Sequence, residues 1–372
     1  MRIAFYHELH KGGARRGTNE FAKQLIKLGH FVDLYLIDNA QSDEKKIYSK
    51  IYFYKFNPKN WRGHNWRVRL YKDTIELFNL WKLNKRIAKD IKNRKYDIAY
   101  IAASQYIESP FILQFLKIPS FFYCNDPYYR IIYEPEIYKP KTNNIIKLGY
   151  EKLNRLLRKY LDRFNIGRAN FIISISKFTR KKFISAYQIK GDVIYYGVDT
   201  SFFNPTKKDK DIDLLYIGSK DFLDGYPLLE GILKKINNKI KTRIITFENE
   251  WLSDKELLDT YRRSKILIAP SYNEPFGLVP LEAMSCGVVV LAVNQGGHRE
   301  TVKNKSTGFL LKRDVNDFVA KINYLLRNKN IISRMSLNAR NDMVKNWDWN
   351  VMGKKLEKLI YKKLNEIQEK SN

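Results

Sequence analysis

Short apolar runs alternate along this chain with longer segments whose apolar residues recur at helical spacing. At the amino end the pattern predicts a strand over Arg2–Tyr6, a turn at Gly12-Gly13, a helix over Asn19–Leu28 and a strand over Phe31–Ile37. Further runs have the form of buried strands at Ile51–Tyr54, Ile98–Ala102, Ser120–Tyr123 and Phe171–Ile175. Strands that alternate with helices in this way are typical of a parallel sheet with crossover helices.

The same alternation starts again in the second half. Asn204-Pro205 and the charged stretch up to Asp211 form the best candidate linker. The strands predicted after it are Leu214–Ile217, Arg243–Phe247, Ile266–Ala269 and Val288–Ala292. The helices predicted there are Tyr226–Ile236, Ser253–Ser264 and Leu278–Cys286, and Ser253 with Glu256 has the capping-box pattern.

These patterns predict an α/β protein with two doubly wound, Rossmann-like domains that face each other across a cleft. A length of 372 residues suits two or three domains. We place the first domain, on the acceptor side, at 1–205 and the second, which binds the nucleotide sugar, at 206–345. A helix over 346–372 is expected to cross back to the first domain. Ligands of such sheets collect at the carboxyl ends of the strands.

Charge and cysteine content narrow the setting. A net charge of +29 indicates a polyanionic environment or partner, such as nucleic acid, anionic lipid or a diphosphate ligand. The alternative is that most of the charge lies on an ordinary solvated surface. The two cysteines, Cys124 and Cys286, make no disulfide framework and fit a reducing compartment. The amino end does not resemble a signal peptide, and no run reaches the ~18 apolar residues of a spanning helix. We therefore expect a cytoplasmic protein, soluble or peripheral on the membrane.

Two segments combine aromatic residues with cations. Trp61 to Lys95 mixes Trp and Tyr with Arg and Lys, and Lys139–Arg168 has the pattern of a long, basic, amphipathic helix. Such segments suit an anionic membrane surface, although tryptophans in the core and solvated lysines explain them equally well. No nucleic-acid-binding module accompanies them, so a nucleic-acid partner is not expected.

The segment from Ile266 to Glu300 carries the clearest chemical signal. A strand runs into a loop that contains Glu274, and a helix begins near Leu278, directly after Gly277. The unpaired amides of a helix start bind phosphate, and a glycine lets a ligand approach the backbone. Glu282 lies about one turn inside the helix, so we expect it to converge with Glu274 near a bound anion. Carboxylates in that position suit sugar hydroxyls; the alternative is that both are ordinary loop and helix charges.

Glu274 and Glu282, with seven residues between them, match the E-x7-E motif of retaining GT-B glycosyltransferases. The surrounding PSYNEPFGLVPLEAMSCG resembles the glycosyltransferase family 4 pattern P-S-x-x-E-x-F-G-x-x-x-x-E-A-M-x-x-G. The resemblance implies that Glu274 contacts the donor sugar and acts in catalysis, and that Glu282 contacts the nucleotide ribose. It also implies that the amides of Phe276, Gly277 and Leu278 face the sugar or the diphosphate.

The resemblance extends over nearly the whole chain. HKGGARRG is similar to the family's glycine loop, which makes Gly12 and Gly13 candidates for donor binding. Ser176 and GVD from Gly197 resemble the stretch that closes the first domain, and Gly296-Gly297 with Glu300 resembles a G-G-x-x-E stretch. NAR from Asn338 and WDW from Trp347 resemble the last segment of the family, which in relatives packs on the first domain.

Two departures from the family pattern affect the expected chemistry. The family has G-R-…-K-G where this chain has GSKDFLDG from Gly218 to Gly225, so Ser219 replaces an arginine and Asp224 a lysine. We keep Gly218, Ser219 and Lys220 as donor-binding candidates; Lys220 either takes over part of the diphosphate neutralisation or is a solvated loop lysine. On the acceptor side, Asn125 stands where relatives often carry histidine, and it is our second catalytic candidate.

The resemblance implies a retaining transferase that moves a hexose or mannose-like sugar from a UDP- or GDP-linked donor to a lipid-linked, glycan or other acceptor. It implies no cofactor and no metal. Asp209, Asp211 and Asp213 resemble a D-x-D metal motif but lie in the charged linker, and the histidines lack ligand spacing. Two alternatives stay open: a non-catalytic relative that binds a nucleotide sugar, and a sugar epimerase with the GT-B fold.

Overall fold

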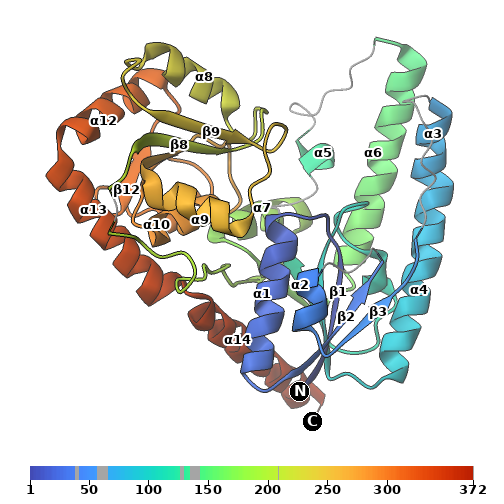
Figure 1. The fold of residues 1–372 in the computed structure, drawn as a ribbon. Coiled ribbons are helices and arrows are strands. Elements are labelled where there is room, and N and C mark those ends of the chain that lie inside the picture. Colours follow the sequence, from blue (N-terminus) through green and yellow to red (C-terminus); the bar gives the residue numbers. More distant parts are fainter. Residues whose placement is uncertain (38–41, 57–65, 126–129, 135–142, 208, 372) are drawn as a thin grey trace. The chain divides into compact units, whose positions relative to one another are not determined.

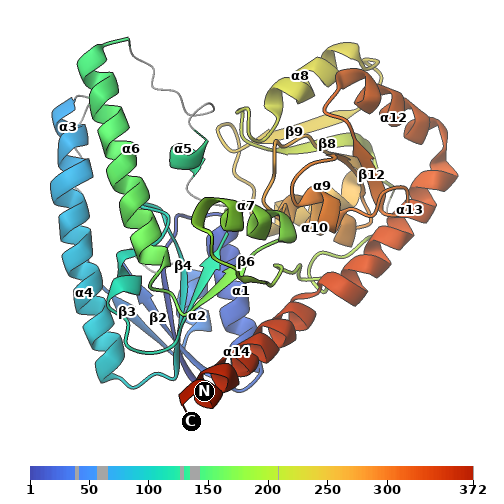
Figure 2. The same cartoon turned by 180° about the vertical axis from the view of Figure 1, so that it is seen from behind.

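The computed structural model describes residues 1–372 except 38–41, 57–65, 126–129, 135–142, 208 and 372 (Figures 1 and 2). The chain divides into two compact units, each with its own parallel sheet. The first unit comprises Met1–Ile175, Thr179–Ile194 and Gly353–Asn372. The second comprises Ser176–Phe178 and Tyr195–Met352. The expected class, two doubly wound α/β domains, is confirmed.

The division after Ile194 lies upstream of the division that we expected after Pro205. Its cause is a parallel bridge between Val198 and Asp348, in which the Val198 amide donates to the Trp347 carbonyl over 2.8 Å. A Cβ on Gly197 would lie only 2.9 Å from backbone atoms of Trp347 and Trp349, so only glycine allows this approach. These contacts hold the segment around Val198 in the second unit.

The first unit is built on parallel strands in the order β3-β2-β1-β4-β5-β6-β7. The strands are β1 (Arg2–Glu8), β2 (Phe31–Leu36), β3 (Lys50–Phe53), β4 (Ile98–Ser104), β5 (Ser120–Cys124), β6 (Phe171–Ser174) and β7 (Asp192–Val193). The order reverses between β1 and β4, which makes these two strands the switch point of the sheet. Tyr100 of β4 stacks on Phe5 of β1, with ring centroids 4.3 Å apart, in the centre of this core.

The helices of the first unit are α1 (Gly13–Lys27), α2 (Ser42–Ile47), α3 (Trp66–Tyr71), α4 (Leu77–Asn93), α5 (Arg130–Tyr133), α6 (Ile145–Ile166) and α7 (Lys177–Tyr187). The π-helical η1 (Lys72–Glu76) joins α3 to α4, and the 3-10 turn η2 (Phe111–Gln114) follows β4. The helix predicted over Asn19–Leu28 begins earlier, at Gly13. The apolar spacing did not indicate this first turn because it is polar, and its Arg15 is buried in an ion pair with Glu44. The helix predicted over Lys139–Arg168 is observed as α6, from Ile145 to Ile166, so 143, 144, 167 and 168 are not helical. Residues 139–142 lie outside the described residues.

The second unit has the strand order β12-β11-β10-β8-β9, again parallel throughout. The strands are β8 (Ile212–Gly218), β9 (Thr242–Thr246), β10 (Ser264–Ala269), β11 (Val289–Val293) and β12 (Gly308–Leu311). The helices are α8 (Tyr226–Lys235), α9 (Asp254–Arg263), α10 (Leu278–Ser285), α11 (His298–Thr301), α12 (Val315–Arg327) and α13 (Lys329–Asp342), followed by the π-helical η3 (Met343–Trp347). The predicted capping box is confirmed: Ser253 caps α9 and Glu256 returns to the Ser253 amide.

Helix α14 (Trp349–Ser371) begins in the second unit and belongs to the first unit from Gly353 onward. Leu356 and Ile360 on this helix are fully buried, and Glu357 bonds the His30 ring over 2.7 Å. A Cβ on Gly353 would collide with the Gln24 side chain of α1, so the helix packs closely there. The last helix therefore completes the core of the first unit.

Candidate functional site

The candidate site of the second unit lies at the switch point of its sheet. The strand order reverses between β8 and β10, and ligands of doubly wound sheets bind beyond the carboxyl ends of such strands. The loop after β8 carries Gly218 to Gly225, and the loop after β10 carries Glu274. The Tyr272 amide donates to the Leu223 carbonyl over 2.7 Å, so the two loops touch.

Two glycines hold the loop that carries Glu274. The Gly297 amide donates to the Glu274 carbonyl over 2.7 Å. Gly296 has a φ of +57°, and a Cβ on it would collide with the backbone of Glu274, so this position requires glycine. A Cβ on Gly297 would lie 2.7 Å from the Phe276 Cα. The G-G-x-x-E resemblance thus has a structural basis: both glycines support the Glu274 backbone.

Gly277 is the N-cap of α10 and has a φ of +91°, which other residues rarely adopt. The free amides of the first turn of α10 follow it, in the arrangement that binds anions. Phe276 is buried against Trp347 and Tyr195, with ring centroids 5.9 and 6.0 Å away. The helix start near Leu278 that the sequence predicts is confirmed, and its position is fixed by an aromatic cluster.

A histidine that sequence reasoning did not select lies beside this helix start. Cδ2 and Nε2 of His298 lie 3.4 Å from the place that a Cβ on Gly277 would occupy. The ring is 1% exposed, and burial lowers the pKa of His298 to about 4. His298 is therefore neutral at physiological pH, with a close-packed edge toward the N-terminus of α10.

Glu282 lies on α10 and is 2% exposed. Its carboxylate accepts a hydrogen bond from the Tyr261 hydroxyl of α9 over 2.9 Å. Tyr261 is fully buried, so this contact fixes the carboxylate from the core side. No local pattern around Tyr261 could have indicated it, because the two helices are distant in sequence. The predicted ribose contact of Glu282 stays a prediction.

The loop after β8 closes on itself. The Asp224 carboxylate accepts the Ser219 amide over 2.5 Å, and the Tyr216 hydroxyl donates to the Ser219 carbonyl over 2.8 Å. Burial raises the pKa of Asp224, the residue at the family's lysine position. Lys220 is exposed, and its Nζ lies 3.4 Å from the Asn249 side chain. The loop thus uses Asp224 to order its own backbone.

Arg262 and Arg263, at the end of α9, are the arginines that could have replaced the missing cations of the loop after β8, but both contact other protein groups. Arg263 pairs with Asp211 over 2.7 Å, and Arg262 donates to the Asn204 carbonyl over 2.9 Å. The Asp211 contact also gives that member of the Asp209, Asp211 and Asp213 group a structural role. Among the described residues, no group of three His, Cys, Asp or Glu side chains is arranged to hold a metal ion.

Glu300 and Ser176 form a second set of contacts around the Glu274 loop. The Glu300 carboxylate accepts the backbone amides of Lys177 and Phe178 over 2.9 and 2.8 Å, and the Tyr195 hydroxyl over 2.8 Å. The Ser176 hydroxyl donates to the Pro275 carbonyl over 2.7 Å. Both residues, noted in the sequence only for their resemblance, therefore position backbone next to Pro275.

The candidates of the first unit lie at the carboxyl ends of its strands. Gly12 is the N-cap of α1 and Gly13 its first residue, directly beyond β1, and a Cβ on Gly12 would meet no atom within 4 Å. Asn125 follows β5 and is buried; its neighbour Asp126 lies outside the described residues. Gly12, Gly13 and Asn125 thus lie at the edge of the sheet where ligands of such folds bind.

A buried polar cluster lies next to this edge and was not found from the sequence. Glu8, the last residue of β1, accepts hydrogen bonds from Tyr6, Ser104 and Asn84, and burial raises its pKa. Arg15 binds Glu44 through two hydrogen bonds of 2.7 Å each. These contacts order the region between β1 and α1. Their acidic members come from a strand end and a short helix, which no motif links.

Comparison with known proteins identifies two glycosyltransferase family models and several relatives. The family model "Glycosyltransferase Family 4" matches residues 11–202, and "Glycosyl transferases group 1" matches residues 206–342. The chain is 27% identical over 219 residues to "Uncharacterized glycosyltransferase MJ1178" of Methanocaldococcus jannaschii, across 54% of this chain and 62% of that protein. It is 26% identical over 217 residues to human "Alpha-1,3/1,6-mannosyltransferase ALG2", across 56% of this chain and 47% of that protein. The match spans less than two thirds of either relative's length.

The fold also matches solved structures. The Anabaena protein Alr3699/HepE, solved in complex with UDP and glucose, superimposes with a TM-score of 0.72 at 16% identity, over 97% of this chain and 99% of that chain. At this identity the likeness concerns the fold, and it confirms the GT-B class expected from the sequence. None of the described helices is long and apolar enough to cross a membrane.

Proposed function

Because this chain belongs to glycosyltransferase family 4, with a group 1 glycosyltransferase domain in its second half, we propose that it transfers a sugar from a nucleotide-sugar donor with retention of configuration. The observation that carries this proposal is the Glu274 loop. It lies at the switch point of the second sheet, on the glycines Gly296 and Gly297, and directly precedes the N-terminus of α10.

The proposed donor is a UDP- or GDP-linked hexose or mannose-like sugar. The solved structure of HepE with UDP and glucose supports a uridine nucleotide, and the name of ALG2 supports a mannosyl group. The first amides of α10 stabilise the negative charge that develops on the departing diphosphate. Glu274 orients the sugar through its hydroxyl groups, and Glu282 holds the ribose.

The loop from Gly218 to Lys220 is the proposed second contact with the diphosphate. The Lys220 ammonium group provides part of the positive potential that the family obtains from an arginine and a lysine. The amides of Ser219 and Lys220 are bound by the carboxylates of Asp224 and Glu248. The resemblance to retaining family members implies that the acceptor hydroxyl attacks from the side of the leaving group. The leaving phosphate serves as the base, without a metal or another cofactor.

Gly12, Gly13 and Asn125 are the proposed contacts from the first unit. The acceptor is a lipid-linked sugar, a glycan or another hydroxyl compound. We place the reaction in a reducing compartment, the cytoplasm, because Cys124 and Cys286 are buried and form no disulfide with each other.

A donor screen tests the function. UDP- and GDP-sugars are added to the wild type, to Glu274→Ala and to Glu230→Ala, which alters an exposed glutamate of α8. We expect one donor to raise the melting temperature of all three proteins and to be hydrolysed slowly by the wild type and Glu230→Ala. Turnover by Glu274→Ala should fall at least a hundredfold, because an interaction that orients the reacting sugar is lost. Equal rates for both variants would refute the role of Glu274.

The second candidate function is a non-catalytic relative that binds a nucleotide sugar. The observation that favours it is the closed loop after β8, in which Asp224 binds the Ser219 amide and takes the place of a cation. Stabilisation by a donor without hydrolysis or transfer to any acceptor would establish this alternative. A donor whose sugar is converted to its epimer without an acceptor would instead establish an epimerase.

A further inference from the structure

The outer face of α6 carries a stripe of exposed apolar side chains. Ile146, Leu153, Leu157, Tyr160 and Phe164 recur at intervals of seven, four, three and four residues, which places them on one side of the helix. They are between 39% and 84% exposed. We name these five residues the outer stripe of α6. A surface helix of a soluble domain normally turns such a stripe toward the core.

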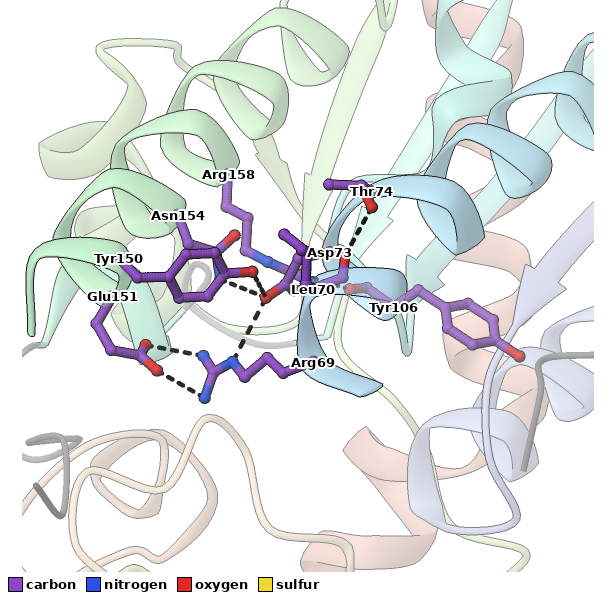
Figure 3. Close-up of polar contacts among 9 residues, drawn as sticks. All are labelled: Arg69, Leu70, Asp73, Thr74, Tyr106, Tyr150, Glu151, Asn154 and Arg158. Carbon is purple, nitrogen blue, oxygen red and sulfur yellow. Dashed lines mark hydrogen bonds and ion pairs between the residues drawn. The ribbon is translucent and has the colours of Figure 1, made fainter. Parts of the chain in front are cut away.

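The inner face of α6 is occupied by polar contacts with the helical run α3–η1–α4, which lies beside it in both views (Figures 1 and 2). Asp73 of η1 accepts hydrogen bonds from Tyr150, Asn154 and Arg158 of α6, over 2.9, 3.0 and 2.5 Å. Figure 3 shows these side chains converging on Asp73, with the Arg69–Glu151 ion pair beside them. The polar side of α6 therefore faces the protein, and its apolar stripe is left on the outside.

The two acidic side chains of α6 are paired or buried, so they add little negative charge to its outer surface. Glu151 and Asp162 are the two acidic residues of α6. Glu151 pairs with Arg69 over 2.8 Å, and Asp162 is 1% exposed and accepts the Tyr187 hydroxyl over 2.7 Å. The exposed charged residues of α6 are Lys147, Lys152 and Arg163. The surface around the outer stripe is thus apolar and cationic.

Tryptophan does not contribute to this surface where the structure describes it. The Trp81 ring packs edge-on against Phe115 with centroids 5.3 Å apart, and its N–H donates to Gln114 over 3.1 Å. Trp61 and the side chain of Trp66 lie outside the described residues. In the stretch from Trp61 to Lys95, Phe78 of α4 is exposed, and the outer stripe of α6 contributes the aromatic residues Tyr160 and Phe164.

From this geometry we propose that the outer stripe of α6 docks on an anionic lipid bilayer, with the helix in the plane of the interface. Apolar side chains enter the boundary between head groups and acyl chains, and Lys147, Lys152 and Arg163 contact anionic head groups. Charge complementarity selects this occupant. A second copy would bring an identical cationic face against the stripe in a chain of net charge +29, and nucleic acid would gain little from aliphatic side chains.

Vesicle sedimentation with the full chain tests the docking surface. The vesicles contain phosphatidylcholine alone or with phosphatidylglycerol, and the variants are Leu153→Glu on α6 and Leu337→Glu on α13. Both leucines are exposed, by 57% and 62%, so both variants should fold. We expect the wild type and Leu337→Glu to bind the anionic vesicles and not the neutral ones. Leu153→Glu should bind them about tenfold more weakly or worse, because an inserted leucine becomes a charge.

A second pair of variants tests the electrostatic part. Lys152→Glu on α6 should weaken binding to anionic vesicles by roughly tenfold, whereas Lys255→Glu, an exposed lysine of α9, should change it little. Equal effects of the paired variants, or binding that does not depend on anionic lipid, would overturn the proposal. If the wild type does not bind vesicles, two further results would overturn the proposal. One is a wild-type dimer that Leu153→Glu dissociates, and the other is binding of single-stranded nucleic acid.

The outcome is independent of the transferase assignment. Donor-induced stabilisation and donor hydrolysis are measured on the same variants without vesicles, and they should match those of the wild type. Failure of the donor screen with normal vesicle binding would refute the proposed function alone. Failure of vesicle binding with normal donor hydrolysis would refute the docking surface alone.

Discussion

Single residues around the start of α10 combine burial with backbone constraint. Gly277 and Gly296 both have a positive φ, and both lie beside residues with a proposed role in the donor site. His298 fills the space next to Gly277 and is held neutral by burial. These residues fix where the free amides of α10 and the Glu274 backbone lie. Gly296 and His298 shape the site through packing, and the contact of the Gly277 amide with the donor stays a prediction.

The neutral state of His298 makes stability depend on pH. Its pKa is lowered to about 4 in the folded chain, whereas an unfolded histidine titrates near ~6.5. As pH falls from about 6.5 toward 4, the unfolded state takes up a proton that the folded state refuses, so stability is lost over this window. Between pH 7.5 and pH 5 this one group costs about 2 kcal/mol.

The measurement is urea unfolding of the wild type and His298→Gln at both pH values. We expect the variant to lose about 2 kcal/mol less than the wild type on acidification, because glutamine has no proton to gain. At pH 7.5 the difference between the two proteins reports packing alone. A variant with the same pH dependence as the wild type would show that folding does not lower the pKa of His298.

At the next level, whole elements are joined by a few polar contacts. In the first unit, Asp73 connects η1 to α6 by three hydrogen bonds. Asp73 lies in the π-helical stretch between α3 and α4, and π-helical turns are frequent at functional positions of helices. The extra backbone residue per turn changes which side chains face α6.

Asp73→Asn should destabilise the chain by about 2 kcal/mol, because hydrogen bonds to a charged group are exchanged for weaker ones. Asp259→Asn is the matched control, since Asp259 is an exposed residue 3.7 Å from Arg263 on the same helix. Its effect should stay within about 0.5 kcal/mol. Urea unfolding gives both numbers, and hydrogen exchange should show the faster opening of Asp73→Asn in α6. Uniform exchange across the chain would contradict a local connection.

In the whole molecule, the first unit is formed from segments on both sides of the second unit in the sequence. The last helix, α14, begins in the second unit and supplies core residues to the first. The first unit is therefore incomplete until α14 has been made. Its stability should depend on residues that are remote in sequence from its sheet.

The double variant Leu356→Ala/Ile360→Ala tests this dependence. Both side chains are fully buried, so their loss should cost roughly 4–8 kcal/mol and unfold or greatly weaken the first unit. Lys355→Ala/Lys358→Ala, which changes the same helix, is the control and should behave like the wild type. Limited proteolysis identifies the segment that becomes susceptible. Cleavage confined to the second unit would disprove the assignment of α14 to the first.

Much of the fold and part of the site follow from local pattern. The strand predictions agree with the structure to within one or two residues, since buried parallel strands are continuous apolar runs. Glu274, Gly277 and the start of α10 were found because turn, glycine and helix start are encoded within a few residues. The capping box at Ser253 was found for the same reason.

Contacts between distant segments could not be found in this way. The division after Ile194 depends on a bridge from Val198 to Asp348, Glu282 is held by Tyr261, and Glu300 binds the amides at Lys177. The inward direction of the acidic residues of α6 is of the same kind, since periodicity alone would turn the apolar stripe inward. Local pattern specifies backbone conformation, because dihedral preferences and periodicity are properties of neighbours. Which face is buried, and which charge finds a partner, depends on what the folded chain brings against it.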